Sequence, residues 1–567
     1  MTMKKQRERR EFLKQLGAVG IGTTTFSSFP FAAQTAERTS SQKSNAESFT
    51  IYLLQTTDVH CQLHAHDELF WENGKIVFRK TGGYAYLASY LNEFRKAHPH
   101  TFLVDTGDMF QGSELSVKTK GKALVPILNQ LRYDLFLPGN WEVVYYKKTM
   151  QQLLGALHAP KVCTNMYHDL GDGKKGELIF QPYHIWHVNG VKIGFIGYTD
   201  PLVPLRQSPN YSKGIIYTQP EENIAHYVDV LRNQEQCAFV VLLSHLGLSQ
   251  QIHLANSPVC EGVDYIFGGD THERVRTPIV CKYAKVVEPG AFGSFVGKLA
   301  LTVQNGKVIK DEYELVEIST TRYKPDKSME ALIAESEHPF LEDLNTVIGY
   351  STLPLYRYFV IENTIDTLIL DALYWKLKDE YKVDVVLSNG FRFCSPRATP
   401  DKTGNIPINS AFLYEMLPVD SIVRVAQATG KQIREWLEKE LNNVFAKNAA
   451  ERFGGWVVKF KGMKITFYAY GEKGQRVQSI LINDQPLDPN KTYTLCACER
   501  DGDPEDVLCR MKGVTNMKNT PFTLHMVMKE YLKVNSPVTP RPALSAKALD
   551  VPQELLTQVR GVDYQFQ

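Results

Sequence analysis

The sequence predicts an α/β protein in which a large N-terminal domain is followed by a second, α+β domain. Three observations lead to this prediction. From residue 49 onward, short apolar runs rich in β-forming residues alternate with amphipathic stretches. The best of these runs end in polar residues, and around residues 324–350 the chain becomes charged and helical before a new alternation begins. The 567 residues have room for about two to four domains.

The predicted elements follow in chain order. Residues 49–54 form a strand, residues 84–94 form a helix because apolar residues recur every three or four positions, and residues 101–104 form the next strand. Further strands are predicted at 135–137, 191–196, 239–243 and 265–267. The second domain begins with a helix at 364–377 and a strand at 383–387.

These patterns also set the expected domain boundaries. Met329, Leu332 and Ile333 share one face of the charged stretch, which predicts a helix that connects the two domains. The predicted divisions are a signal and tether at 1–48, the first domain at 49–323, the connecting helix at 324–350, the second domain at 351–550 and a tail at 551–567.

The N-terminus is typical of a twin-arginine export signal. Arg9 and Arg10 are followed by Phe12, Leu13 and Lys14, and then by a weakly apolar stretch of small residues. The expected location is therefore the periplasm, where a protein exported in the folded state arrives with its metal already bound.

Composition excludes several classes of function. Lys and Arg number 64 against 62 for Asp and Glu, so the net charge of +2 gives no reason to expect nucleic-acid binding. No run after the N-terminus approaches the roughly 20 apolar residues that cross a bilayer. The nine cysteines are an odd number without zinc-ribbon spacing, so a disulfide framework does not organise the fold.

Five motifs follow predicted strands and carry metal-binding residue types. Carboxylate, imidazole and amide oxygen together form a ligand set for two divalent cations, which a shared carboxylate bridges about 3.5–4 Å apart. The motifs are Asp58-Val59-His60, Gly107-Asp108-Met109-Phe110-Gln111-Gly112, Gly139-Asn140-Trp141-Glu142, Ser244-His245-Leu246-Gly247 and Gly268-Gly269-Asp270-Thr271-His272.

In this order the motifs resemble the calcineurin-type metallophosphoesterase superfamily and its 5'-nucleotidase branch. The resemblance implies a four-layer α/β/β/α sandwich domain, a C-terminal substrate-binding domain and two divalent metal ions. It places Asp58, His60, Asp108 and His272 at one metal and Asp108, Asn140, His245 and Asp270 at the other, with Asp108 bridging. Asp270 departs from the family pattern, which has histidine there. The added carboxylate favours a harder metal such as manganese over zinc or iron.

Position 141 is the second departure. The family pattern has histidine there and an aspartate three residues later, which assist the leaving group, whereas this sequence has Trp141 and Val144. An alkoxide leaving group benefits from a general acid. A thiolate, with a reference pKa near about 8.5, leaves without one.

These features resemble SoxB, the thiosulfohydrolase family of sulfur oxidation. The motifs that carry the resemblance are Asn140-Trp141-Glu142, residues 107–113, Gly390-Phe391-Arg392 and residues 499–504. The resemblance implies a manganese pair and release of sulfate from a cysteine S-thiosulfonate on a SoxYZ carrier protein.

Candidate roles follow from these motifs. Asn140, Trp141 and Arg392 are the candidate catalytic residues, and Asn389 and Phe391 join Arg392 as candidates for substrate binding. Glu142 is expected to hold the metal ligands by hydrogen bonds. Cys61, His64 and His66 are interpreted as structural.

Three hypotheses about function remain open at this point. The first is hydrolysis of a protein-borne thiosulfonate. The second is a periplasmic 5'-nucleotidase or 2',3'-cyclic phosphodiesterase, for which Phe391 and Phe393 could grip a base. The third is a non-catalytic binding protein on a former phosphatase fold, which the losses at positions 141, 144 and 270 favour and the retained ligand types oppose.

Overall fold

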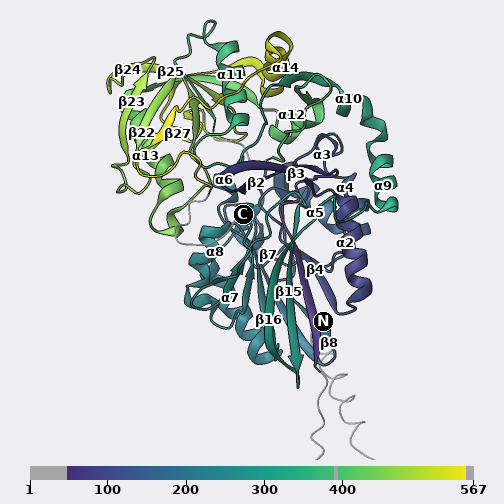
Figure 1. Cartoon of the computed structure of the whole chain (residues 1–567). Helices are drawn as coiled ribbons and strands as arrows, with labels where there is room; N and C mark the ends of the chain where they lie inside the picture. Colours follow the sequence, from purple (N-terminus) through teal and green to yellow (C-terminus); the bar gives the residue numbers. More distant parts are fainter. Residues whose placement is uncertain (1–47, 389–393, 557–567) are drawn as a thin grey trace, which may run out of the picture. The chain divides into compact units, whose positions relative to one another are not determined.

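The computed structural model describes residues 48–388 and 394–556 (Figure 1). Residues 1–47 of the predicted signal and tether and residues 557–567 of the predicted tail lie outside these ranges. The same holds for four residues of the predicted substrate site, Asn389, Phe391, Arg392 and Phe393. Among the described residues, no helix combines the length and the apolar character needed to cross a bilayer.

The first domain contains two large sheets. One has five strands in the order β16 (Lys307–Glu317), β15 (Phe295–Gln304), β1 (Phe49–Thr56), β4 (Thr101–Asp105) and β5 (Leu135–Phe136). The other has six strands in the order β13 (Ile279–Val280), β14 (Lys285–Val287), β12 (Tyr265–Phe267), β11 (Phe239–His245), β9 (Val191–Thr199) and β8 (Tyr183–Val188). The predicted strands of this domain are therefore confirmed.

Aromatic contacts show how the layers stack. Phe102 of β4 lies 4.9 Å from the ring of Phe195 on β9, so the two sheets face each other. On the other side, Tyr52 of β1 packs at 5.1 Å against Phe94 of α2 (Tyr84–Ala97). The outer face of the second sheet packs against α7 (Pro220–Asp229) and α8 (Leu248–Ala255). The predicted α/β/β/α order is confirmed.

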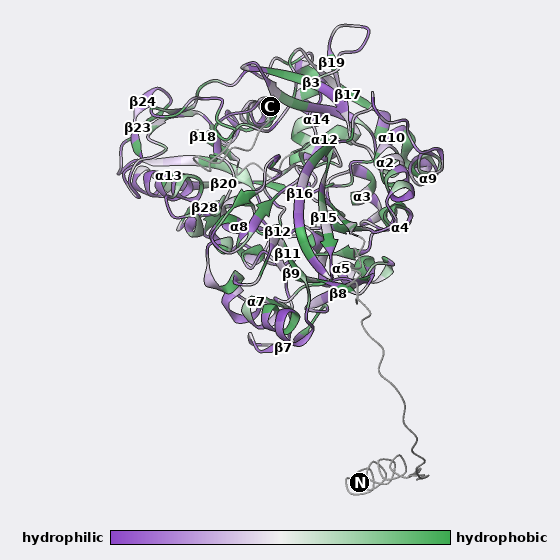
Figure 2. Ribbon diagram, turned by 60° about the horizontal axis from the view of Figure 1, so that its bottom comes forward, coloured by the Kyte–Doolittle hydropathy of each residue, from purple (hydrophilic) through white to green (hydrophobic). Residues whose placement is uncertain are grey.

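Hydropathy follows this layering. Figure 2 shows apolar residues along the central strands β11 and β12, whereas α7 carries both polar and apolar residues. Ile224 and Val228 are the buried apolar residues of α7, and Glu221 and Glu222 lie in its first turn. A helix with one apolar stripe of this kind covers a sheet and presents its charged face to solvent.

Smaller elements complete the first domain. The hairpin β2 (His66–Glu72) and β3 (Lys75–Thr81) follows the first motif, and α6 (Val203–Arg206) follows β9. The remaining elements are α3 (Glu114–Thr119), α4 (Leu124–Leu131), α5 (Tyr146–Ala156), β6 (Met166–Asp169), β7 (Lys175–Leu178) and β10 (Ile215–Tyr217).

The connecting segment differs from the predicted single helix. It contains α9 (Lys327–Glu337), a 3-10 turn at His338–Phe340 and α10 (Leu341–Asn345). Proline lacks the backbone N–H and clashes with the preceding turn, so Pro339 ends the regular helix. From Val347 the chain is already a strand, β17 (Val347–Ser351).

The second domain is built on a five-stranded sheet in the order β21 (Lys459–Lys461), β18 (Val385–Ser388), β25 (Thr492–Cys498), β20 (Ile422–Thr429) and β28 (Thr515–Thr523). A four-stranded sheet holds β24 (Gln485–Pro486), β23 (Val477–Ile482), β22 (Met463–Phe467) and β29 (Ala546–Ala548). The helices are α11 (Thr364–Leu377), α12 (Ser410–Met416), α13 (Gly430–Phe445) and α14 (Leu524–Asn535).

Candidate dimetal site

The predicted ligands lie at the carboxyl ends of parallel strands or in the loops that follow. β1, β4 and β5 run parallel in one sheet, and β9, β11 and β12 run parallel in the other. Loops beyond these ends converge on one crevice. They bring together Asp58, His60, Asp108, Asn140, His245, Asp270 and His272.

The loops reach this arrangement through unusual backbone conformations. Asp58, His60, Asp108 and His272 all have positive φ, between 49° and 64°. Aspartate adopts this left-handed region more readily than most residues. A side chain at Gly139 would collide with the Asp108 carboxylate, so the loop needs glycine there.

Distances define the centre of the cluster. Asp58 Oδ1 lies 3.3 Å from His272 Nε2, 3.8 Å from His60 Nε2 and 3.9 Å from His245 Nε2. Asp108 Oδ2 lies 3.3 Å from His245 Nε2 and 3.7 Å from His60 Nε2. These five side chains form two overlapping groups that could each hold a metal ion, one around His60 and His272 and one around His245. The assignment of ligands to individual ions stays a prediction.

The orientation of the cluster fits metal ions. Asp58 Oδ1 and His245 Nε2 are buried and have no hydrogen-bond partner among the described residues. His245 Nδ1 lies 2.6 Å from the Thr106 carbonyl and His60 Nδ1 lies 2.9 Å from the Gln111 carbonyl. Such contacts to the far ring nitrogen fix a metal-binding imidazole with its other nitrogen toward the ion.

The electrostatics show how strongly these groups interact. Burial alone would raise the pKa of the Asp58 carboxyl, but His272, His245 and His60 together hold that pKa below its usual value. Burial would lower the pKa of His245, yet Asp108, Asp58 and Asp270 raise it well above the usual value. Concentrated negative charge of this kind attracts cations.

Glu142 supports the loops instead of entering the cluster. Its carboxylate accepts hydrogen bonds from the backbone N–H groups of Asp108 at 3.0 Å, Met109 at 2.7 Å and Gly139 at 2.5 Å. Burial, and next the nearby Asp108 carboxylate, raise the pKa of Glu142 to about 7. Glu142 therefore joins the loops after β4 and β5, as the sequence predicts.

Trp141 lies beside the cluster and supplies no imidazole. Its backbone N–H donates to Asp108 Oδ1 at 2.7 Å, and its side chain lines the pocket. Val144 is buried at 7% exposure. Among the described residues that line the pocket, the histidines are His60 and His272, both of the cluster.

Two residues that hold Asn140 and Asp270 were not predicted from the sequence. Asn140 Nδ2 donates to Asp270 Oδ1 at 2.6 Å, and Gln207 Nε2 donates to Asn140 Oδ1 at 2.9 Å. Arg206 Nη1 lies 2.9 Å from Asp270 Oδ2 and 3.1 Å from Asp200 Oδ2. The signal that could have found Arg206 is the carboxylate at position 270, since a buried extra charge needs a cation nearby.

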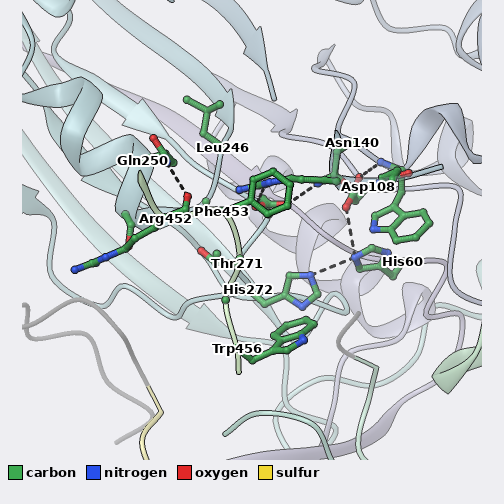
Figure 3. Close-up of a pocket in the computed structure, with 18 of the residues that line it drawn as sticks. His60, Asp108, Asn140, Leu246, Gln250, Thr271, His272, Arg452, Phe453 and Trp456 are labelled. Atoms are coloured by element: carbon green, nitrogen blue, oxygen red, sulfur yellow. Dashed lines mark hydrogen bonds and ion pairs between the residues drawn. The ribbon is translucent and has the colours of Figure 1, made fainter. Parts of the chain in front are cut away.

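The pocket over the cluster has a second wall, which comes from the second domain (Figure 3). Phe453 lies across from Asn140 and Asp108, and Trp456 lies beside His272. The Phe453 ring has Arg206 at 5.6 Å and Arg510 at 5.7 Å from its centre. The described residues of this wall are Arg452, Phe453, Gly454, Gly455, Trp456 and Arg510. A pocket lined by cationic and aromatic groups suits an anionic ligand with a planar ring.

The neighbouring cysteine and histidines lie outside the metal-binding groups. Cys61 Sγ donates to the Met109 carbonyl, His64 lies 2.8 Å from Glu337, and His66 lies 3.2 Å from Glu68. Their contacts agree with a structural role.

Two family profiles match the chain. The calcineurin-like phosphoesterase profile matches residues 51–274, and the 5'-nucleotidase C-terminal domain profile matches residues 347–499. The chain thus joins a calcineurin-like phosphoesterase domain to a 5'-nucleotidase C-terminal domain. Such phosphoesterases bind two divalent metal ions, and the cluster described above supplies the ligand groups. The chain is therefore a dimetal hydrolase, which removes the ground for the non-catalytic alternative.

Relatives of this two-domain hydrolase differ in described activity. The trifunctional nucleotide phosphoesterase YfkN of Bacillus subtilis (strain 168) is 25% identical over 500 residues, which cover 80% of this chain and 33% of YfkN. The chain thus spans about a third of the length of that relative.

Two solved structures share the fold of this phosphoesterase. The sulfate thiohydrolase SoxB of Thermus thermophilus has a TM-score of 0.79 at 22% identity, over 89% of this chain and 98% of SoxB. A 5'-nucleotidase precursor, also from Thermus thermophilus, has a TM-score of 0.74 at 23% identity, over 89% of this chain and 100% of that one. At these identities the fold is shared with both, and the likeness does not separate the SoxB type from a 5'-nucleotidase.

Proposed function

We propose that this chain is a nucleotide phosphoesterase that prefers bonds whose leaving group departs as an anion, such as a phosphoanhydride. The observation that carries the proposal is the pocket, in which the ligand cluster faces Phe453 and Trp456 of the 5'-nucleotidase C-terminal domain. Its relatives include a nucleotide phosphoesterase.

The ligand cluster would bind the two divalent ions through the seven predicted side chains. When bound, such a pair lowers the pKa of a water molecule and polarises the oxygens of a tetrahedral substrate. Asp58, Asp108 and Asp270 give three carboxylates to this set, which supports manganese as the proposed metal, because hard oxygen ligands suit harder ions.

The opposite wall would bind the nucleoside. Base stacking on an aromatic side chain contributes about 1–3 kcal/mol per base. Arg452 and Arg510 lie on the same wall, where guanidinium groups can bind phosphate oxygens. Arg510 also pairs with Glu440, which fixes its orientation.

The leaving group follows from Trp141. An alkoxide has a high pKa and needs a proton from a general acid, an aid worth about 10²–10⁴-fold. A phosphate leaving group, whose second pKa is near about 6, departs as an anion. The pocket walls described above hold no imidazole beyond the metal cluster, so a phosphoanhydride suits this site better than a phosphomonoester.

The test compares AMP with ADP, since both carry the same base and differ in the leaving group. With manganese-loaded protein, we expect kcat/KM for ADP to exceed that for AMP by at least about tenfold. Phosphate release is measured, with metal content checked in the same preparation. Equal rates on both, or no turnover of either, would contradict the proposal.

A second candidate function is hydrolysis of a cysteine S-thiosulfonate on a SoxYZ-type carrier. The absence of an acid at position 141 favours it equally, because a thiolate also leaves without a proton. Sulfate release from a carrier conjugate, without phosphate release from ADP, would favour this candidate. Periplasmic location through the twin-arginine segment is a further proposal, which a fusion of residues 1–48 to a reporter would test.

A further inference from the structure

Asp270 and Arg206 form a pair that the family pattern does not predict. The pattern has a neutral imidazole at position 270, and the carboxylate adds one negative charge beside the second group of ligands. Both oxygens of Asp270 are engaged, Oδ1 by Asn140 at 2.6 Å and Oδ2 by Arg206 at 2.9 Å. The carboxylate is therefore held between the ligand cluster and a guanidinium.

We infer that Arg206 is a positioning residue that offsets the charge of Asp270, so that the site keeps its attraction for an oxyanion. The side chains of Arg206 and Asp270 are only 14% and 13% exposed, and Asp200, the second partner of Arg206, is 2% exposed. Ion pairs this buried are weakly screened by salt.

The charge count explains the effect. Replacing a neutral ligand by Asp270 lowers the charge of the site by one, and Arg206 restores it. An anionic substrate at the metal ions would otherwise meet an extra carboxylate, whose field acts over several ångströms in a partly buried pocket. Arg206 itself lines the pocket, where Phe453 covers its guanidinium at 5.6 Å.

The segment that carries Arg206 is fixed from both sides. The next residue, Gln207, donates to Asn140 at 2.9 Å, so consecutive residues hold the Asn140–Asp270 pair. From the second domain, Arg500 Nη1 donates to the Leu205 carbonyl at 2.8 Å, and Asp501 accepts from Asn210 at 3.0 Å. This gives the motif at residues 499–504 a role in positioning Arg206.

The experiment uses the full chain, with manganese and inorganic phosphate as probes. For Arg206→Gln, we expect two manganese ions to stay bound, by elemental analysis, at an affinity no weaker than in the parent, because a competing cation is gone. Phosphate affinity by calorimetry should fall about tenfold, the range expected for one lost charge interaction. Arg206→Lys, which keeps the charge, should stay within about threefold.

A double variant provides the decisive comparison. In Arg206→Gln/Asp270→His both charges are removed, so phosphate affinity should return to within about threefold of the parent, a coupling that two merely structural residues would not show. Arg232→Gln is the matched control, since Arg232 pairs with Asp264 outside the pocket and should change neither measurement. Circular dichroism verifies that each variant is folded.

Three results would overturn the inference: unchanged phosphate affinity in Arg206→Gln, loss of a metal ion in that variant, or no recovery in the double variant. The inference rests on the proposed function only in that an oxyanion binds at the metal ions. If these binding results hold and neither ADP nor AMP is hydrolysed, the nucleotide proposal fails while the role of Arg206 stands.

Discussion

The chain buries two clusters of charged side chains, and they differ in how their polar atoms are used. In the first domain, Asp58 Oδ1 and His245 Nε2 lack hydrogen-bond partners among the described residues and point into the centre of a group of ligands. In the second domain, Arg357 Nε lies 2.9 Å from Asp366 Oδ1, and Lys459 Nζ donates to the carbonyls of Val360 at 3.1 Å and Ile361 at 2.5 Å.

This difference separates a binding site from a structural ion pair. A buried charge is stable only when partners compensate it. The second cluster finds its partners within the protein, so it serves the fold. The first cluster concentrates carboxylates and imidazoles around a centre that metal ions would fill, so its compensation comes on binding. Exchanging one aspartate in each cluster tests the distinction.

Asp108→Ala should have the largest effect on function. Asp108 lies between His60 and His245, at 3.7 and 3.3 Å, so its loss should remove both metal ions and lower turnover at least about a thousandfold. The thermal unfolding midpoint without metal should change little, because a desolvated carboxylate is removed. Asp343→Ala, at an exposed ion pair with Lys118, is the control. Two ions retained by the Asp108 variant would contradict the bridging assignment.

Asp366→Ala should have the opposite profile. It leaves Arg357 and Lys459 buried without their carboxylate, and breaking such a pair costs about 3–5 kcal/mol of unfolding free energy. Denaturant titration measures this loss, while metal content of the folded protein should stay at two ions. Asp371 lies on the same helix α11 and pairs with Lys461 at the surface, so Asp371→Ala should cost less than about 1 kcal/mol. A stable Asp366 variant that binds no metal would break the comparison.

The second cluster also predicts a pH dependence. Burial lowers the pKa of Lys459 from 10.5 to about 8, although Asp366 and Glu362 partly oppose this. Between these values the unfolded chain binds more protons than the folded protein, so stability should rise with pH, by at most about 3 kcal/mol. Lys459→Met should remove this rise in unfolding free energy, measured by urea titration from pH 8 to pH 10. An unchanged slope would show that another group titrates.

Phe453→Ala tests the wall opposite the metal ligands. If a base stacks on this ring, KM for ADP should rise about tenfold, within the 1–3 kcal/mol expected for stacking, while inhibition by inorganic phosphate stays nearly the same. Trp375, an aromatic residue 41% exposed on α11, provides the matched control through Trp375→Ala. Weaker phosphate inhibition in the Phe453 variant alone would indicate that the ring acts through Arg206 and not on the base.

How far the sequence predicts the molecule depends on how local each signal is. The predicted strands and the ligand motifs were found because each motif directly follows an apolar run, and parallel strands bring their ends together. Arg206 lies 64 residues from Asp270, and no local pattern marks it. Phe453 and Trp456 reach the pocket through packing between domains, which no single segment encodes. The connecting helix was predicted too long because its apolar face continues past Pro339.

The smallest expected effect is that of Trp141→His, and it sharpens the comparison between the site and its surroundings. A histidine restores the acid of the family pattern, but Val144 provides no carboxylate to orient it. Orientation of the imidazole by a third group is part of how such acids work. We therefore expect AMP hydrolysis to rise by less than about tenfold, well below the 10²–10⁴ of a positioned acid. Adding Val144→Asp should raise it further, and Trp141→Phe, which keeps an aromatic ring, controls for changes in packing. A single variant with efficient AMP hydrolysis would show that the leaving group does not explain the tryptophan.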